Sequence, residues 1–390
     1  MPILQMTDAP QTYAVSKFTN SGFGDHLSCV FGTWWYARQT GRTLVIDWRG
    51  SRFNPTPGQN CFFAFFKEIT SLGGVPVIAD DRVAQMDLPL PVYPDKWTAQ
   101  TLKGATHVPH TADEIRAMNA LVAQTTPRPE PTVVINQHIH TIPAAAHMRP
   151  LLAELQFADK VSAAADAFCA QHWKGRTAIG VHIRHGNGEN IGGRASYWLD
   201  PIPLLRQLRL NQQFDLHQRS AAGTARGKYH DNAAPSLTDT PHTSRTESRL
   251  YRDVAARITD LRGTPDFQDA VVFLCTDAKR VEEGLARHID GICTYPKHML
   301  QEGGGPLHQV SLAAESRTDG FAPVESDIVT EMLIELELLR RTRALVCIPS
   351  QFSVISRLEL PAERQFFLTP SVRNRLISRM FDRFSRRRSA

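Results

Sequence analysis

The stretch TAIGVHIRHGNGEN (residues 177–190) is the most informative part of this chain. Residues 177–183 are apolar and rich in branched side chains, which predicts a buried β-strand. Because side chains alternate along a strand, we expect His182 and Arg184 on one face and Val181 and Ile183 on the other. The polar, glycine-rich residues that follow lie where the strand ends. That is the edge at which open α/β sheets bind their ligands.

Apolar runs of the same kind predict further buried strands, at 43–48, 75–79, 132–137, 270–277, 291–296, 344–349 and 365–370. Helical spacing of apolar residues lies between several of them, at 27–39, 148–172, 279–288 and 326–342. Strands that alternate with helices indicate parallel sheets that carry helices on both faces. We therefore predict an α/β fold.

The chain has 390 residues with 42% apolar content, which is enough for two domains, each with its own core. We place the boundary at the helical stretch near Pro150, so that residues 1–150 form an N-terminal domain and residues 151–370 a C-terminal one. Residues 211–248 are rich in Ser, Thr, Ala and Pro but poor in bulky apolar side chains, so we expect a disordered surface insertion there.

The net charge of +5 originates in the tail at 371–390, which holds seven arginines and one aspartate. The rest of the chain is nearly neutral, which disfavours nucleic acid as a partner. Apolar residues recur at helical spacing between these arginines, so the tail predicts a basic amphipathic helix. Such a helix either packs its apolar face on the protein or contacts an anionic membrane surface, and the sequence leaves both open.

The six cysteines are scattered without a C-x-x-C pair, which is typical of buried thiols in a reducing compartment. The first residues lack the features of a signal peptide, and no run approaches the ~18 apolar residues of a membrane span. We expect a cytoplasmic protein, with the basic tail as the part that would touch the inner face of the membrane.

The residues after the strand at 177–183 have the chemistry of a diphosphate site. Arg184 carries a planar, permanently charged fork, and Gly186 and Gly188 let backbone N–H groups approach phosphate oxygens. Glu189 adds a carboxylate to the same loop. A salt bridge between Arg184 and Glu189 over an ordinary turn is the alternative interpretation.

Two other motifs carry weaker signals. The sequence GFGD (Gly22, Phe23, Gly24 and Asp25) predicts an N-terminal loop that approaches a ligand, or equally a tight turn. Asp277 follows the predicted strand at 270–277 and is suited either to bind hydroxyl groups or to cap the next helix. The chain contains no D-x-D triplet, so Arg and backbone donors would have to stabilise a leaving diphosphate without a metal ion.

Collinear blocks resemble the α-1,6-fucosyltransferases of glycosyltransferase family 23, and within that family the rhizobial nodulation enzymes that modify chito-oligosaccharides. These blocks are SGFGDHL (21–27), QTGRTLVIDWRGS (39–51), GGVPVIADDRV (73–83), IGVHIRHGNGEN (179–190), YW (197–198), VFLCTDA (272–278), GGPLH (304–308) and the unit from about 327 to 352. The resemblance spans most of residues 15–355.

The resemblance implies a GT-B-type fold, in which two Rossmann-like domains with parallel sheets face a cleft, with the N-terminal domain on the acceptor side. It also implies GDP-fucose as the donor, no metal or other cofactor, inversion at the anomeric carbon, and a glycan acceptor that contains GlcNAc. Arg184 matches the arginine on which activity in the family depends. The donor site would further comprise His182, His185, Gly186, Asn187, Gly188, Asp277 and His308.

Two positions depart from the family pattern. Glu335 stands where an aspartate is expected, and either Ser350 or Ser353 takes the place of the family's serine. Glu189 is our first candidate for the general base and Asp25 our second, although Glu189 and Arg194 could instead brace the loop. A glycan-binding protein without catalysis, or an enzyme resembling O-fucosyltransferases that act on protein, remains the alternative function.

Overall fold

The computed structural model describes residues 11–18, 22–54, 56, 58–105, 108, 110–136, 145–184, 241–299, 326–348 and 350–368. The chain divides into two compact units, and it leaves the first at Asp159 to enter the second at Lys160. Residues just beyond 150 remain with the first unit because their backbone bonds to it. Lys67 N–H donates to Gln156 O and Ala158 N–H to Phe65 O, both at 2.9 Å.

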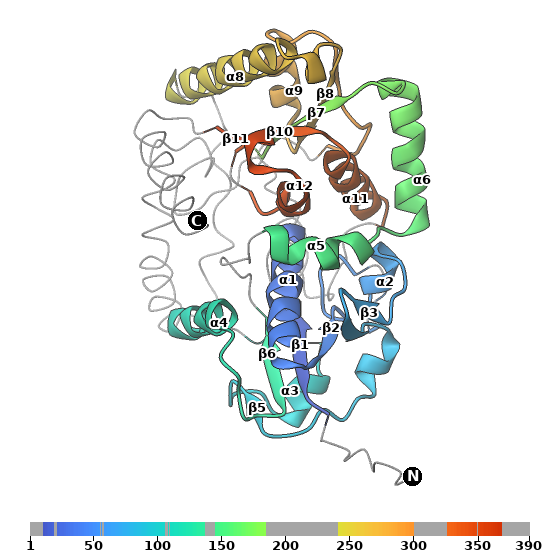
Figure 1. Ribbon diagram of the computed structural model, residues 1–390, viewed down its shortest axis with the longest axis vertical. Coiled ribbons are helices and arrows are strands. Elements are labelled where there is room, and N and C mark those ends of the chain that lie inside the picture. Colours follow the sequence, from blue (N-terminus) through green and yellow to red (C-terminus); the bar gives the residue numbers. More distant parts are fainter. Residues whose placement is uncertain are drawn as a thin grey trace, which may run out of the picture. The chain divides into compact units, whose positions relative to one another are not determined.

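The first unit is built on a six-stranded sheet in the order β3-β4-β2-β1-β6-β5 (Figure 1). All neighbouring strands are parallel except the β3–β4 pair. Its elements are β1 (Tyr13–Lys17), α1 (Phe23–Thr40), β2 (Thr43–Asp47), α2 (Phe62–Phe65), β3 (Ser71–Leu72), β4 (Val75–Ile78), η1 (Asp81–Ala84), β5 (Val92–Tyr93), α3 (Ala99–Lys103), α4 (Ala112–Gln124), β6 (Thr132–Ile135) and α5 (Ala145–Glu154).

Local sequence signals account for the ends of several helices. Helix α1 ends at Gly41, whose φ of 67° lies in the left-handed region that glycine adopts without a Cβ penalty. Helix α4 begins with a capping box, in which the Thr111 hydroxyl accepts from Glu114 N–H and the Glu114 carboxylate accepts from Thr111 N–H.

The second unit has a five-stranded sheet in the order β11-β10-β7-β8-β9, and all of its strand pairs are parallel. Its elements are α6 (Asp159–Phe168), a π-helical turn η2 (Cys169–Trp173), β7 (Ala178–Ile183), α8 (Pro241–Arg262), η3 (Pro265–Phe267), β8 (Val271–Thr276), α9 (Lys279–Ala286), β9 (Ile292–Cys293), α11 (Ser326–Arg340), β10 (Ala344–Cys347), α12 (Val354–Glu359), η4 (Ala362–Arg364) and β11 (Gln365–Phe367). Helices α8 and α9 lie on one side of these strands, and α11 and α12 on the other (Figure 1).

Strand β7 shows the alternation that its sequence predicts. Ile179, Val181 and Ile183 belong to one hydrophobic core with residues of α8 and α9. Gly180 faces α11, where a Cβ would meet the Thr342 hydroxyl at 2.8 Å. Glycine at this position therefore lets the end of α11 pack directly against the strand.

Several expectations from the sequence are wrong in detail. The helix predicted at 148–172 is interrupted after Glu154 and resumes at Asp159, because the intervening backbone bonds to the first unit. Residues 241–248, assigned to a disordered insertion, begin helix α8, whose later turns bury Leu250, Val254 and Ile258 in the core. The rest of that insertion, residues 211–240, lies outside the described residues. Among the helices of the described segments, we find none with the length and apolar character to cross a membrane.

Candidate active site

The end of β7 holds a buried histidine. His182 is 4% exposed and pairs in register with Cys275 of β8 on one side and Cys347 of β10 on the other. Its ring centroid lies 5.3 Å from that of Phe352. Its Nδ1 is buried and has no hydrogen-bond partner among the described residues. A buried ring nitrogen without a partner at the carboxyl end of a central strand is suited to hydrogen-bond a ligand.

The electrostatics around His182 favour its neutral form. Burial, together with the positive charges of Arg357, Lys297 and Arg184, lowers the pKa of His182 to about 3. The imidazole is therefore neutral at physiological pH, and one of its nitrogens can donate while the other accepts. Because Glu335 neutralises Lys297, the positive field at this edge of the sheet comes from Arg357 and Arg184, and such a field suits an anionic ligand.

The end of β8 contributes Thr276 and Asp277 to the same edge. Thr276 is buried, and its hydroxyl has no hydrogen-bond partner among the described residues. Asp277 is half-buried. Helix α9 has Ala278 as its N-cap residue, with no side-chain cap hydrogen bond. The N-cap position of α9 is therefore Ala278 and not Asp277.

A buried ion pair joins this edge to helix α11. Glu335 is 4% exposed, and its carboxylate pairs with the Lys297 ammonium, which also donates to Thr276 O. Burial raises the pKa of Glu335, and the Lys297 charge opposes that rise. The sequence analysis did not identify Lys297. The one local feature that could have pointed to Lys297 is its position directly after the predicted strand at 291–296.

The loop after β10 carries the two candidate serines. Both Ser350 and Ser353 are buried, at 7% and 0% exposure. The Ser350 hydroxyl accepts from Phe352 N–H at 3.2 Å, and the Ser353 hydroxyl donates to Ser350 O at 3.4 Å. Among the described residues, the Ser353 hydroxyl thus donates within the loop, whereas the Ser350 hydroxyl only accepts there and can still donate to a ligand.

The remaining predicted donor residues lie outside the described part of the chain. These residues are His185, Gly186, Asn187, Gly188, Glu189 and His308. Within the described part, the structure brings His182, Arg184, Asp277 and Glu335 to the ends of neighbouring strands or to the helix that packs on them. Arg184 follows β7 directly and is half-buried.

The GFGD motif is not the loop that the sequence predicted. Phe23, Gly24 and Asp25 form the first turn of α1, and Gly22 is its N-cap residue. Phe23 starts the helix because its ring packs edge-on against Trp48, Phe53 and Phe65, at centroid distances of 5.5 to 5.7 Å. The Asp25 carboxylate lies in the first turn, where the helix dipole favours negative charge.

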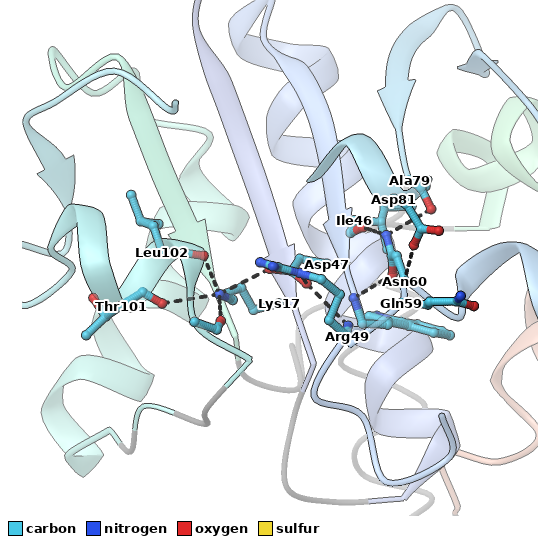
Figure 2. A network of polar contacts seen from close by, with 12 residues as sticks. Lys17, Ile46, Asp47, Arg49, Gln59, Asn60, Ala79, Asp81, Thr101 and Leu102 are labelled. Atoms are coloured by element: carbon cyan, nitrogen blue, oxygen red, sulfur yellow. Dashed lines mark hydrogen bonds and ion pairs between the residues drawn. The ribbon is translucent and has the colours of Figure 1, made fainter. Parts of the chain in front are cut away.

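A second charged cluster, which the sequence analysis missed, lies at the ends of β1 and β2 of the first unit (Figure 2). Asp47 accepts two hydrogen bonds from Arg49, both at 2.9 Å, and pairs with Lys17 at 3.1 Å. Lys17 also donates to the carbonyls of Leu102 and Gly104. Burial opposes ionisation of Asp47, yet Arg49 and Lys17 hold its pKa below the usual range. Because Lys17 has several partners, this cluster braces the strand ends.

The second unit thus gathers cations, a neutral histidine and polar atoms without partners among the described residues at the carboxyl ends of parallel strands. The first unit is a second α/β body, so the chain is a two-unit α/β protein with a candidate anion site. The chain belongs to the nodulation protein Z (NodZ) family, whose model matches residues 11–222 and 227–385.

Curated relatives extend over nearly the whole chain. Nodulation protein Z of Sinorhizobium fredii (strain NBRC 101917 / NGR234) is 28% identical over 377 residues, which cover 94% of this chain and 97% of that protein. Nodulation protein Z of Bradyrhizobium diazoefficiens is also 28% identical, over 91% of this chain and 81% of that protein.

Solved structures agree on the fold. Fucosyltransferase NodZ from Bradyrhizobium superposes with a TM-score of 0.58 at 22% identity, over 90% of this chain and 94% of that one. NodZ α-1,6-fucosyltransferase co-crystallised with GDP gives a TM-score of 0.55 at 24% identity, with the same coverage of both chains. The predicted α/β fold of GT-B type is confirmed.

Proposed function

We propose that this protein transfers fucose from GDP-fucose to O6 of a GlcNAc residue in an oligosaccharide or glycolipid acceptor. The observation that carries the proposal is the positive field at the carboxyl ends of β7, β8 and β10, which suits a nucleoside diphosphate. Membership of the NodZ family supports the same substrate, since a NodZ α-1,6-fucosyltransferase has been soaked with GDP-fucose.

In the proposed donor site, the Arg184 guanidinium binds the diphosphate with its planar fork. The neutral His182 and the Ser350 hydroxyl supply hydrogen bonds, and Asp277 and Glu335 provide carboxylates. The loop from His185 to Glu189 and His308 complete the site. Arginine and backbone donors then meet the charge that develops on the leaving group, and the reaction needs no metal ion.

The reaction we propose is a direct displacement with inversion. The acceptor hydroxyl oxygen attacks the anomeric carbon of fucose, and the bond from that carbon to the β-phosphate oxygen breaks. GDP leaves with the electron pair, and the hydroxyl proton passes to a carboxylate. Glu189 is our first choice for this base. Asp25, in the first turn of α1, is the second and would act from the unit that we assign to the acceptor.

We further propose that the protein works in the cytoplasm and that its basic tail contacts anionic lipid at the inner face of the membrane. The support is the arrangement of arginines and apolar residues at 373–388.

A panel of donors in differential scanning fluorimetry tests the proposed substrate. A ligand that binds only the folded state raises the melting temperature according to its concentration and affinity. GDP and GDP-fucose should stabilise the protein, whereas UDP-sugars at the same concentration should not. Equal stabilisation by UDP-sugars, or no stabilisation by GDP-fucose, would contradict the proposal.

A further inference from the structure

Arg357 of helix α12 is a half-buried cation with few partners among the described residues. Its Nε is inaccessible to solvent and has no hydrogen-bond acceptor among the described residues. Its Nη2 donates to the side-chain oxygen of Gln351 at 3.3 Å, and its guanidinium carbon lies 5.9 Å from the centroid of the Phe367 ring. Within the described segments, no carboxylate forms an ion pair with it. The guanidinium therefore keeps most of its charge and hydrogen-bonding capacity unused.

Three other arginines of the second unit have carboxylate partners. Arg340 pairs with Glu359, Arg341 with both Glu337 and Asp166, and Arg364 with Asp266. A cation that is partly withdrawn from water without a counterion costs the folded protein free energy. Burial accordingly lowers the pKa of Arg357. A bound anion would balance the charge of an arginine that has no carboxylate partner among the described residues.

The position of Arg357 in the fold indicates which anion could balance its charge. Gln351, which holds Arg357, precedes Phe352, whose ring packs near His182. The charge of Arg357 is also felt by His182 and by Cys347, the last residue of β10. Arg357 thus belongs to the cations around the carboxyl ends of β7 and β10. Lys297 among these cations is neutralised by Glu335, whereas Arg357 has no such partner in the described structure.

We infer that Arg357 binds the diphosphate of the nucleotide donor as a second arginine beside Arg184. The inference rests on the proposed function, because it takes the ligand to be a nucleoside diphosphate sugar. The phosphate oxygens would supply the acceptors that Nε and the free edge of the guanidinium lack. Since the charge on the diphosphate grows as the sugar leaves, Arg357 would stabilise the leaving group as well as the bound donor.

The test compares the affinity for GDP, inorganic pyrophosphate and guanosine in the wild type and in Arg357→Met, by calorimetry. Arg364→Met serves as the matched control, because Arg364 is a surface arginine of the same unit with a carboxylate partner. We expect Arg357→Met to weaken GDP and pyrophosphate roughly 10- to 100-fold, the range of a hydrogen bond to a charged group. Guanosine affinity should not change, and the control should bind all three ligands like the wild type.

Thermal unfolding without ligand separates binding from a structural role. Removal of a half-buried charge that has no carboxylate partner among the described residues should leave the melting temperature of the ligand-free protein equal or higher. A lower melting temperature with an unchanged ratio of GDP to guanosine affinity would overturn the inference. If Arg357→Met does not fold, Arg357→Lys replaces it in the test. The lysine keeps the charge but loses the planar fork, so this variant should bind GDP with an affinity between those of the wild type and the methionine variant.

The outcome also distinguishes this inference from the proposed function. If the wild type binds GDP-fucose and Arg357→Met binds it equally well, only the inference fails. If the wild type binds pyrophosphate through Arg357 but not GDP or GDP-fucose, the anion site stands and the proposed donor is wrong. Absence of binding by all of these ligands would overturn both.

Discussion

Replacement of Lys297 by methionine should strongly destabilise the second unit. Glu335 is buried and Lys297 nearly so, with side-chain exposures of 6% and 11%. The variant leaves the Glu335 carboxylate without its counterion, and loss of one partner of a buried pair costs about 3–5 kcal/mol. At about 1.4 kcal/mol per factor of ten, amide protons that exchange only through unfolding of this unit should lose between about 10² and about 10⁴ of their protection.

The loss of stability in Lys297→Met should grow as the pH rises. Burial raises the pKa of Glu335, and the lysine no longer opposes that rise in the variant. The folded pKa of this carboxyl group then lies above its unfolded value, so folding favours the protonated form. The associated stability is fully present below the unfolded pKa and is lost as the pH rises through the folded pKa. The variant should be closest to the wild type in acid and weakest at neutral and alkaline pH.

Hydrogen exchange followed by mass spectrometry measures this effect for each unit separately. Peptides from β7 and β8 should lose protection at neutral pH, while peptides from β1 and β2 serve as the internal reference. Lys279→Met is the matched control, since Lys279 pairs with Glu282 at the surface and such pairs contribute under about 0.5 kcal/mol. Lys297→Met combined with Glu335→Met should recover much of the loss. Full protection of β7 and β8 at neutral pH in the single variant would refute the reasoning.

Four further outcomes follow from the proposed chemistry. Arg184→Lys keeps the charge but loses the bidentate fork, so turnover should fall at least ~10²-fold with the melting temperature unchanged; near-normal turnover removes Arg184 from the mechanism. Fucose transfer should survive exhaustive chelation by EDTA, and activity that returns only with Mn²⁺ or Mg²⁺ would contradict a metal-free site. Glu189→Gln should lower turnover ~10²-fold or more without a change in GDP affinity, whereas a defect confined to Asp25→Asn would assign the base to the first unit. In liposome flotation, binding to anionic vesicles should depend on Arg386 to Arg388, and binding indifferent to them leaves the tail a packing role.

The sequence predicted the strands that build the site because their signal is local. Strands β7 and β8 are continuous apolar runs, and the residues that follow them, Arg184 and Asp277, were therefore expected at one edge of the sheet. Strand β1 was missed, since YAVSK carries a serine and a lysine among only five residues. Lys17 is buried there because Asp47 and several carbonyl oxygens surround it, and those partners are distant in the sequence.

Other residues were missed for the same reason, because their partners are distant in the sequence. Lys297 lies 38 residues from Glu335, and a charged pair has no periodicity by which its members can be matched. Arg357 sits on a six-residue helix, too short for an apolar pattern to define its buried face. The GFGD motif was misassigned for a related reason, because Phe23 is fixed by the rings of Trp48, Phe53 and Phe65, which no local pattern predicts.

The protonation state of His182 constrains where the acceptor's proton can go. Its pKa of about 3 makes the imidazole too weak a base to hold a proton near neutral pH, since burial and the surrounding cations both oppose protonation. A protonated ring would also lose the acceptor nitrogen that the neutral imidazole offers to a ligand. In the reaction we propose, His182 therefore acts as a hydrogen-bonding group, and the proton must pass to a carboxylate instead. The neutral ring of His182 thus leaves Glu189 and Asp25 as the proposed bases.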